Sequence, residues 1–315
     1  MEAAVALGER GRGRTAPNPT VGCIIVKDGE VLGRGWTQPG GRPHAEAEAL
    51  GQAGEKVHAA DVYVTLEPCA HVSERGPACA DLLVEARPAR VLVAVGDPDP
   101  RTDGTGIARL QSAGITVATG LQREAAERSL AGFLTRVRLG RPYITLKLAM
   151  SLDGKIALPS GESRWITGED ARAHVHLERA RCDMILVGRG TYEADTPRLD
   201  VRLPGLADRS PRRALLTRGE PAEGWIRLDR PEAVYELGEV NDLLVEGGSA
   251  TATAFLAADL VDRMLIYRAP ILIGDGKSSI GYIGLGSLAE AHHRWRLAET
   301  RELGIDRLEV YERVR

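Results

Sequence analysis

Aromatic side chains are scarce in this sequence of 315 residues, which has four Trp, seven Tyr and two Phe. Lysine is also rare, with five residues against 36 arginines. The hydrophobic cores must therefore be built mainly from Val, Leu, Ile and Ala. An arginine excess can reflect many anion contacts or the coding bias of the source genome, and we favour the coding bias.

Long apolar runs and a strong net charge are missing as well. No stretch approaches the roughly 18–20 consecutive apolar residues of a membrane span, and the first residues, MEAAVALGERGRGR, do not resemble a secretory signal. A net charge of −3 argues against a nucleic-acid partner. Four cysteines are too few for a disulfide framework in a chain this long. We therefore expect a cytoplasmic protein with no membrane partner.

The order of predicted elements indicates an α/β protein with two domains. In the first half, apolar strand patterns alternate with helical patterns, which favours a layered sandwich with a largely parallel sheet. The pattern starts again at Gly140-Arg141-Pro142, so we place the domains at 1–140 and 141–315. The predicted strands are 21–27 and 31–36, joined as a hairpin by Asp28-Gly29, and 61–67, 90–95, 115–118, 143–150, 182–188, 242–248, 261–274 and 305–314. The predicted helices are 44–54, 77–86, 105–113, 122–138 and 169–181.

Three short segments of the first half carry residues typical of a catalytic zinc site. His44, Cys69 and Cys79 supply three ligands, which leaves a fourth position open for water. Glu46 stands two residues after His44, where its carboxylate can carry a proton without binding the metal. The order of these residues matches the zinc deaminase signature, although the second cysteine follows the first by ten residues instead of three. We expect one Zn²⁺ per chain, with Glu46 as the catalytic residue.

Two alternatives to this interpretation remain open. The first is a zinc deaminase of nucleosides or nucleic acids with an appended non-catalytic nucleotide-binding domain, although no basic stripe with interleaved aromatics supports it. The second is a structural zinc module, but structural zinc usually has four protein ligands. Cys23 and Cys182 are left as core residues.

Four segments of the first half, Ala16–Gly22, His44–Glu46, Thr65–His71 and Pro77–Asp81, resemble the deaminase half of the bifunctional riboflavin-biosynthesis deaminase–reductases. The resemblance implies a cytidine-deaminase-like three-layer α/β/α sandwich. It also implies hydrolytic deamination of 2,5-diamino-6-(5-phospho-ribosylamino)pyrimidin-4(3H)-one, a small-molecule pyrimidine ribosyl phosphate. Asn18 and His71 correspond to positions near the pyrimidine and become substrate-binding candidates.

The second half resembles the reductase half of the same family, a fold akin to dihydrofolate reductase, through Thr145–Lys155, Ser160–Thr167, Leu186–Thr191 and Val245–Ser249. No G-x-G-x-x-G motif supports a Rossmann site, so the resemblance alone implies NADPH as the cofactor and reduction of the ribosyl group to ribityl. It places the cofactor at Ala149, Trp165, Thr191, Asp195, Gly248, Ser249, Ala250, Thr251, Ala252, Thr253 and Ala254, and the substrate at Ser163, Arg179, Leu199, Arg202 and Glu246.

Three further expectations follow from this resemblance. Guanidinium groups grip phosphates, so Arg179 and Arg202 are expected at the ribose 5-phosphate. Asp195 is a candidate to donate a proton near the imine form of the substrate, or to orient the groups around that imine. The protein is expected to form a homo-oligomer, a dimer or a tetramer. The segment 218–241 is short for the strand and helix expected there, which puts the competence of the reductase in question.

Overall fold

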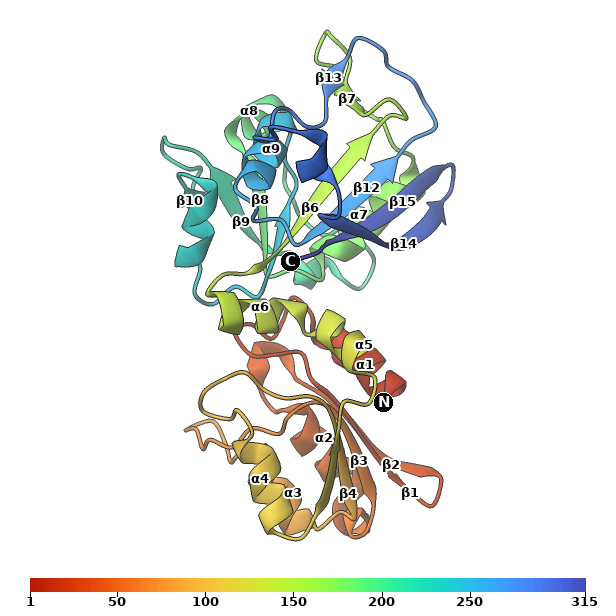
Figure 1. Cartoon of the computed structure of the whole chain (residues 1–315), viewed down its shortest axis with the longest axis vertical. Helices are drawn as coiled ribbons and strands as arrows, with labels where there is room; N and C mark the ends of the chain where they lie inside the picture. Colours follow the sequence, from red (N-terminus) through yellow and green to blue (C-terminus); the bar gives the residue numbers. More distant parts are fainter. The chain divides into compact units, whose positions relative to one another are not determined.

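The computed structural model describes the whole chain, Met1–Arg315, which divides into two compact units, Met1–Gly140 and Arg141–Arg315 (Figure 1). Each unit has its own sheet and its own hydrophobic core. None of the helices combines the length and the apolarity that crossing a membrane requires.

The first unit is built on a five-stranded sheet in the order β2-β1-β3-β4-β5. The antiparallel hairpin of β1 (Gly22–Lys27) and β2 (Glu30–Trp36) joins β3 (Asp61–Leu66), which continues in parallel to β4 (Arg90–Val95) and β5 (Thr116–Thr119). Helices cover both faces, which makes the expected three-layer sandwich (Figure 1). On one face lie α1 (Glu2–Gly8) and α5 (Arg123–Ser129), and on the other lie α2 (Ala45–Ala53), α3 (Cys79–Ala86) and α4 (Thr105–Ser112).

Two glycines let helices lie directly on the hairpin. A Cβ atom at Gly22 would lie 1.9 Å from the carbonyl oxygen of Ala4 in α1, and one at Gly35 would lie 1.9 Å from the carbonyl oxygen of Ala45 in α2. Any side chain at either position would push the helix away, because backbone atoms cannot yield at such distances. The contact at Gly35 therefore fixes the first turn of α2.

The helix predicted over 122–138 is two helices, α5 and α6 (Ala131–Leu139). The break falls at Leu130, which has φ −94° and ψ 5° and a buried side chain. Leu130 packs in one core with Ala126 of α5 and Phe133 of α6. Packing against the sheet thus overrides the helical sequence pattern.

The second unit contains an eight-stranded sheet in the order β10-β9-β8-β11-β6-β12-β15-β14. The strands from β10 to β12 are parallel, and the last two are antiparallel to their neighbours. A small ribbon of β7 and β13 stands apart. The strands are β6 (Tyr143–Met150), β7 (Lys155–Ala157), β8 (Met184–Gly188), β9 (Arg212–Leu216), β10 (Ile226–Leu228), β11 (Asp242–Val245), β12 (Arg263–Arg268), β13 (Lys277–Ser278), β14 (Trp295–Leu303) and β15 (Asp306–Arg313).

Both faces of this sheet are apolar, as the continuous apolar strands predict. In β8, Met184 and Leu186 join the core that α9 (Ser249–Ala257) covers, whereas Ile185 and Val187 join a core on the other side. The helix α7 (Glu169–Arg179) packs on that other side against β12 and β15. The short α8 (Arg189–Asp195) follows β8.

Sequence and structure differ at two places in this unit, the strand predicted over 261–274 and the unpredicted strand β14. The strand predicted over 261–274 ends at Arg268, two residues before Pro270, which has no N–H for a sheet ladder. The edge strand β14 was not predicted, because its side chains are mostly exposed and show no apolar alternation. The segment 218–241 forms only β10 and a short 3-10 helix over Pro231–Glu236.

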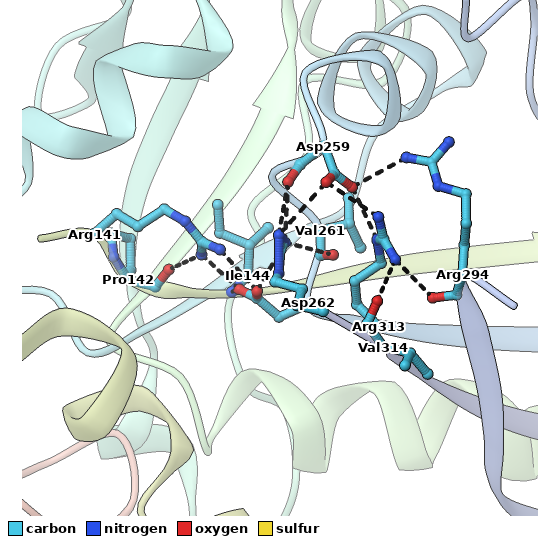
Figure 2. A network of polar contacts seen from close by, with 10 residues as sticks. Arg141, Pro142, Ile144, Asp259, Val261, Asp262, Arg294, Arg313 and Val314 are labelled. Atoms are coloured by element: carbon cyan, nitrogen blue, oxygen red, sulfur yellow. Dashed lines mark hydrogen bonds and ion pairs between the residues drawn. The ribbon is translucent and has the colours of Figure 1, made fainter. Parts of the chain in front are cut away.

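A polar network ties the end of the chain to the start of this unit (Figure 2). Arg141 donates two hydrogen bonds to Asp262, at 2.6 and 2.8 Å, and both side chains are buried. Asp262 also accepts the backbone N–H of Ile144 in β6. Nearby, Asp259 accepts hydrogen bonds from Arg313 at the end of β15 and from Arg294. The loop after α9 is therefore held by both the first and the last strand of the unit.

Candidate active sites

The three predicted zinc ligands of the first unit converge in one cluster. The Nδ1 atom of His44 lies 3.5 Å from the Sγ atom of Cys69 and 3.3 Å from the Sγ atom of Cys79. The three ligand atoms all lie within 4.8 Å of one another. His44 directly precedes α2 and Cys79 begins α3, so both stand at helix N-termini, where the helix dipole favours a thiolate.

This cluster has the chemistry and the spacing of a zinc site. Ligands at about 2.3 Å for sulfur and about 2.0–2.1 Å for nitrogen, in a tetrahedron, stand roughly 3.6 Å from one another. The sulfur–nitrogen distances in the cluster are close to that value. The Sγ atom of Cys69 also accepts hydrogen bonds from the thiol and the backbone N–H of Cys79, which lower the pKa of Cys69 to about 4. A thiolate at Cys69 is the form that binds metal.

Glu46 lies beside the cluster in the first turn of α2, completely buried. Burial raises the pKa of Glu46 to about 7, since its charged form loses water and neighbouring groups compensate only in part. Its carboxylate shares a hydrogen bond with the Cys79 thiol. A carboxyl group with a pKa near neutral pH can both take and return a proton.

Glu67, which the sequence analysis did not single out, anchors the loop that carries Cys69. This buried carboxylate accepts backbone N–H groups of Asp97 at 3.2 Å, Gly104 at 3.1 Å and Ile107 at 3.0 Å. Three such hydrogen bonds join the end of β3 to the loop after β4. An acidic residue immediately before Pro68-Cys69 is the sequence signal that could have found this role.

The two pyrimidine-binding candidates lie near this cluster, Asn18 in space and His71 in the sequence. The side chain of Asn18 occupies the space above Gly41, where a Cβ atom would lie 1.8 Å from the Nδ2 atom of Asn18. Gly41 precedes His44 by three residues, so Asn18 is next to the segment that leads into the cluster. His71 follows Cys69 by two residues, and its Nδ1 atom is buried without a hydrogen-bond partner. Such an unpaired polar atom is suited to a ligand contact.

In the second unit, a cavity of 740 Å³ opens beside the carboxyl ends of β6, β8 and β11. All five predicted substrate residues line it: Ser163, Arg179, Leu199, Arg202 and Glu246. Eight of the predicted cofactor residues line it as well: Ala149, Trp165, Thr191, Asp195, Gly248, Ser249, Ala250 and Thr251. The last three predicted residues do not. Ala252 is packed in the core, and Thr253 and Ala254 lie further along α9, where the Thr253 hydroxyl accepts the N–H of Gly281.

Two helix N-termini meet at this cavity. The backbone N–H of Gly248, just before α9, donates to the hydroxyl of Thr191 in α8 at 3.2 Å. Gly188 and Gly247 make room for Thr251, whose side chain would lie 2.0 Å and 2.5 Å from Cβ atoms at those positions. Because the positive dipole ends of two helices lie at the cavity there, the arrangement suits a phosphate-bearing cofactor.

Three charged side chains form one wall of the cavity. The carboxylate of Glu246, just after β11, accepts two hydrogen bonds from Arg179, at 2.7 and 2.9 Å. The Nζ atom of Lys147 in β6 lies 3.9 Å from Glu246. Burial opposes the charge of Glu246, yet attraction to Arg179 and Lys147 holds its pKa below the usual value. Lys147 is buried too, and burial lowers its pKa.

The remaining charged residues of the cavity are more exposed. Arg202 has a side chain 60% exposed and lies 3.6 Å from Asp200. Asp195 accepts a hydrogen bond from Arg164 at 2.6 Å. Lys147 and Arg164 line the cavity, although sequence reasoning gave neither a role in binding. No residue of 218–241 lines it.

Both units match known protein families. Residues 142–308 match the family described as RibD C-terminal domain, and residues 1–95 match the cytidine and deoxycytidylate deaminase zinc-binding region. The riboflavin biosynthesis protein RibD of Escherichia coli is 40% identical, and the match covers 97% of this chain and 96% of that protein. The RibD protein of Mycobacterium tuberculosis is 39% identical over 94% of this chain and 91% of its own.

Solved structures with the same architecture cover the whole chain. The Acinetobacter baumannii RibD structure is 35% identical, covers 100% of this chain and 98% of its own, and has a TM-score of 0.90. The Thermotoga maritima deaminase–reductase is 30% identical, covers 100% of this chain and 97% of its own, and also has a TM-score of 0.90. These findings confirm the predicted α/β fold and do not favour the nucleic-acid deaminase alternative. The chain belongs to the RibD family of bifunctional riboflavin-biosynthesis deaminase–reductases.

Proposed function

We propose that the first unit performs the hydrolytic deamination of this pathway on the diaminopyrimidinone ribosylamino 5′-phosphate. The observation that carries the assignment is the cluster of His44, Cys69 and Cys79, with Glu46 beside it. These three side chains would hold the zinc ion. When bound, zinc acts as a Lewis acid that activates a water molecule for attack on the amino-bearing ring carbon.

Glu46 is the general base and general acid of this reaction. Its carboxylate takes one proton from the attacking water and returns it to the amino group, which leaves as ammonia. The ring carbon becomes a carbonyl, and the second proton of the water passes to the adjoining ring nitrogen. The raised pKa of Glu46, about 7, suits both transfers near neutral pH. Asn18 and His71 are proposed to orient the pyrimidine ring. The unpaired Nδ1 atom of His71 supports this role.

For the second unit, we propose reduction of the ribosyl group of the deaminated product in the 740 Å³ cavity. NADPH supplies the hydride when bound, and the N-termini of α8 and α9 with Thr191 would hold its phosphates. With the cofactor bound, C1′ of the ring-opened imine would be reduced and the adjoining nitrogen would take up a proton. Lys147 is the proposed proton source, since burial lowers its pKa and makes its ammonium a better donor. Asp195 is proposed to organise Arg164 on the cavity wall.

Arg202 and Ser163 are proposed to bind the 5′-phosphate at the mouth of this cavity. The Arg202 guanidinium is mostly exposed and is only loosely paired with Asp200, so it is available to an incoming anion. Trp165 lines the cavity and is 68% exposed, with the guanidinium of Arg172 over its ring at 4.8 Å from the centroid. The remaining exposed surface of Trp165 is proposed to contact the cofactor ring.

One assay tests both halves of the proposal. The purified protein is incubated with the diaminopyrimidinone ribosylamino 5′-phosphate, with and without NADPH, and ammonia and product mass are followed. We expect ammonia release in both samples and a two-hydrogen mass gain only with NADPH. Ammonia release from tRNA or single-stranded DNA alone would overturn the assignment.

We also propose that the protein works in the cytoplasm as a homo-oligomer, a dimer or a tetramer. All four cysteines are free, and two of them must stay reduced to bind zinc, which a reducing compartment favours. Light scattering coupled to size-exclusion chromatography measures the oligomeric state, and fractionation of the source cells tests the location.

A further inference from the structure

The segment 197–202 carries two of the proposed substrate residues, Leu199 and Arg202, yet it belongs to no helix or strand. Contacts from other parts of the unit must therefore hold its backbone. The buried side chain of Leu199 packs in the core beside it. The backbone N–H of Val201 donates to the hydroxyl of Ser210 at 3.0 Å. The end of the segment at Arg202 is held by a side chain of α7.

That side chain is His176. The backbone N–H of Arg202 donates to the Nδ1 atom of His176 at 3.3 Å, and no backbone carbonyl accepts this N–H. The same Nδ1 atom lies 3.1 Å from the carbonyl oxygen of Asp200, which already accepts a hydrogen bond from Arg179 at 3.1 Å. A neutral imidazole with its proton on Nε2 suits these neighbours, because its Nδ1 atom can then accept the N–H of Arg202.

The groups around His176 favour this neutral form. Burial and the positive charges of Arg179 and Arg202 lower the pKa of His176, and the Asp200 carbonyl oxygen and the Glu246 carboxylate oppose them only in part. The carboxylate of Asp200 lies 3.6 Å from the guanidinium of Arg202. A proton gained at acid pH would turn Nδ1 into a donor, which would leave the N–H of Arg202 without an acceptor.

We propose that His176 is a positioning residue of the reductase: in its neutral form it accepts the N–H of Arg202 and holds the segment 197–202 in place for substrate binding. The inference rests on the proposed reduction in this cavity. His176 does not line the cavity and acts through the backbone of Arg202. Loss of this acceptor, by substitution or by protonation, should therefore weaken substrate binding and leave the chemical step unchanged.

Substitution of His176 tests this role through KM. His176→Ala removes the acceptor and should raise KM for the deaminated substrate about 10-fold, the effect of one hydrogen bond of ordinary strength. The value of kcat should stay within about twofold, because the ground state and the transition state lose the same contact. His176→Asn places an amide oxygen near the position of Nδ1 and should restore a normal KM at neutral pH. A normal KM in His176→Ala, or equal defects in the two variants, would overturn the proposal.

The pH profile of KM is a readout that a merely structural histidine would not move. In the unaltered protein, KM should rise as the pH falls through the pKa of His176, since the protonated ring cannot accept the N–H of Arg202. The phosphate of the substrate also titrates, at about pH 6, so His176→Asn is measured beside the unaltered protein at every pH. The amide does not titrate, so KM of this variant should rise less steeply at acid pH. Superimposable profiles would contradict the proposal.

A double-mutant cycle shows whether His176 acts through Arg202. Arg202→Ala removes the guanidinium but keeps the backbone N–H, so adding His176→Ala should raise its KM by less than about twofold. Losses that multiply would mean that His176 acts elsewhere. His292→Ala removes the same side chain from an exposed position outside the cavity and should leave KM unchanged, as the matched control.

A folding control separates these outcomes from a failed assignment. Binding of NADPH, measured by fluorescence, shows that each variant is folded. If His176→Ala does not bind NADPH, His176→Leu, which fills the space without an acceptor, is measured in its place. Absence of reduction in the unaltered protein would instead refute the proposed function.

Discussion

The two sites of this chain are built in different ways. The deaminase cluster consists of four side chains within 36 consecutive positions, and its chemistry is evident from the residue types alone. The reductase cavity is lined by side chains and backbone from at least six elements, most of them ordinary in type. A metal site depends on the positions of a few ligand atoms. A cavity depends on the packing of the strands and helices around it, which we call its frame.

The largest expected effect breaks one site and leaves the other intact. Cys69→Ser should reduce the zinc content from one per chain toward zero and abolish ammonia release, because three ligands are the fewest that a catalytic zinc site uses. Reduction of the chemically prepared deaminated intermediate should continue at the normal rate. Metal analysis and the two separate assays measure this. A full zinc complement in the variant would mean that the ligand set is wrong.

Glu46→Gln should separate metal binding from proton transfer within the first site. The amide keeps the shape of the side chain but can no longer accept the proton, so zinc should stay at one per chain. Ammonia release should fall by about 10²–10⁴-fold, the usual contribution of a general acid–base group. Glu48→Gln, in the same turn of α2 but outside the cluster, is the matched control. Normal turnover by Glu46→Gln would remove the proton-shuttle assignment.

A substitution in the buried polar network of the second unit should destabilise that unit, although it alters no residue that lines the cavity. Arg141→Ala leaves Asp262 buried beside only Arg315 and should lower the free energy of unfolding of that unit by about 3–5 kcal/mol. Arg296→Ala removes an exposed pair with Glu312 and should cost about 0–1 kcal/mol. Urea unfolding followed by circular dichroism measures both. Equal effects would show that the buried network of Figure 2 does not hold the frame.

The smallest expected effect concerns the mouth of the cavity. Arg202→Ala should raise KM for the phosphorylated substrate by about 10-fold and leave kcat nearly unchanged, since it removes binding that the ground state and the transition state share. Ammonia release should not change. Steady-state NADPH oxidation against substrate concentration provides the test, and a loss confined to kcat would place Arg202 in the chemical step instead.

The two sites also differ in how far the sequence alone could predict them. Most strands of the parallel sheets, although not β9 and β10, and the ligand set of His44, Cys69 and Cys79 were accessible from patterns and residue types. The engagement of Arg179 with Glu246 was not, because the two residues are 67 positions apart and meet only when α7 packs on the sheet. The break at Leu130 and the exposed edge strand β14 were missed for a related reason, since tertiary packing decides both.

The hydrogen bonds of Glu67 bear on which residues after β4 can vary during evolution. Its carboxylate binds the loop after β4 only through backbone N–H groups, which every residue except proline offers. Two side-chain restrictions are evident: Gly104 has φ +79°, and at Gly106 in α4 a Cβ atom would lie 2.1 Å from the carbonyl oxygen of Pro68. The loop and the first turn of α4 are thus attached to the end of β3 by their main chain. The other residues that donate to Glu67 can therefore change over evolutionary time while the neighbouring Cys69 stays in register.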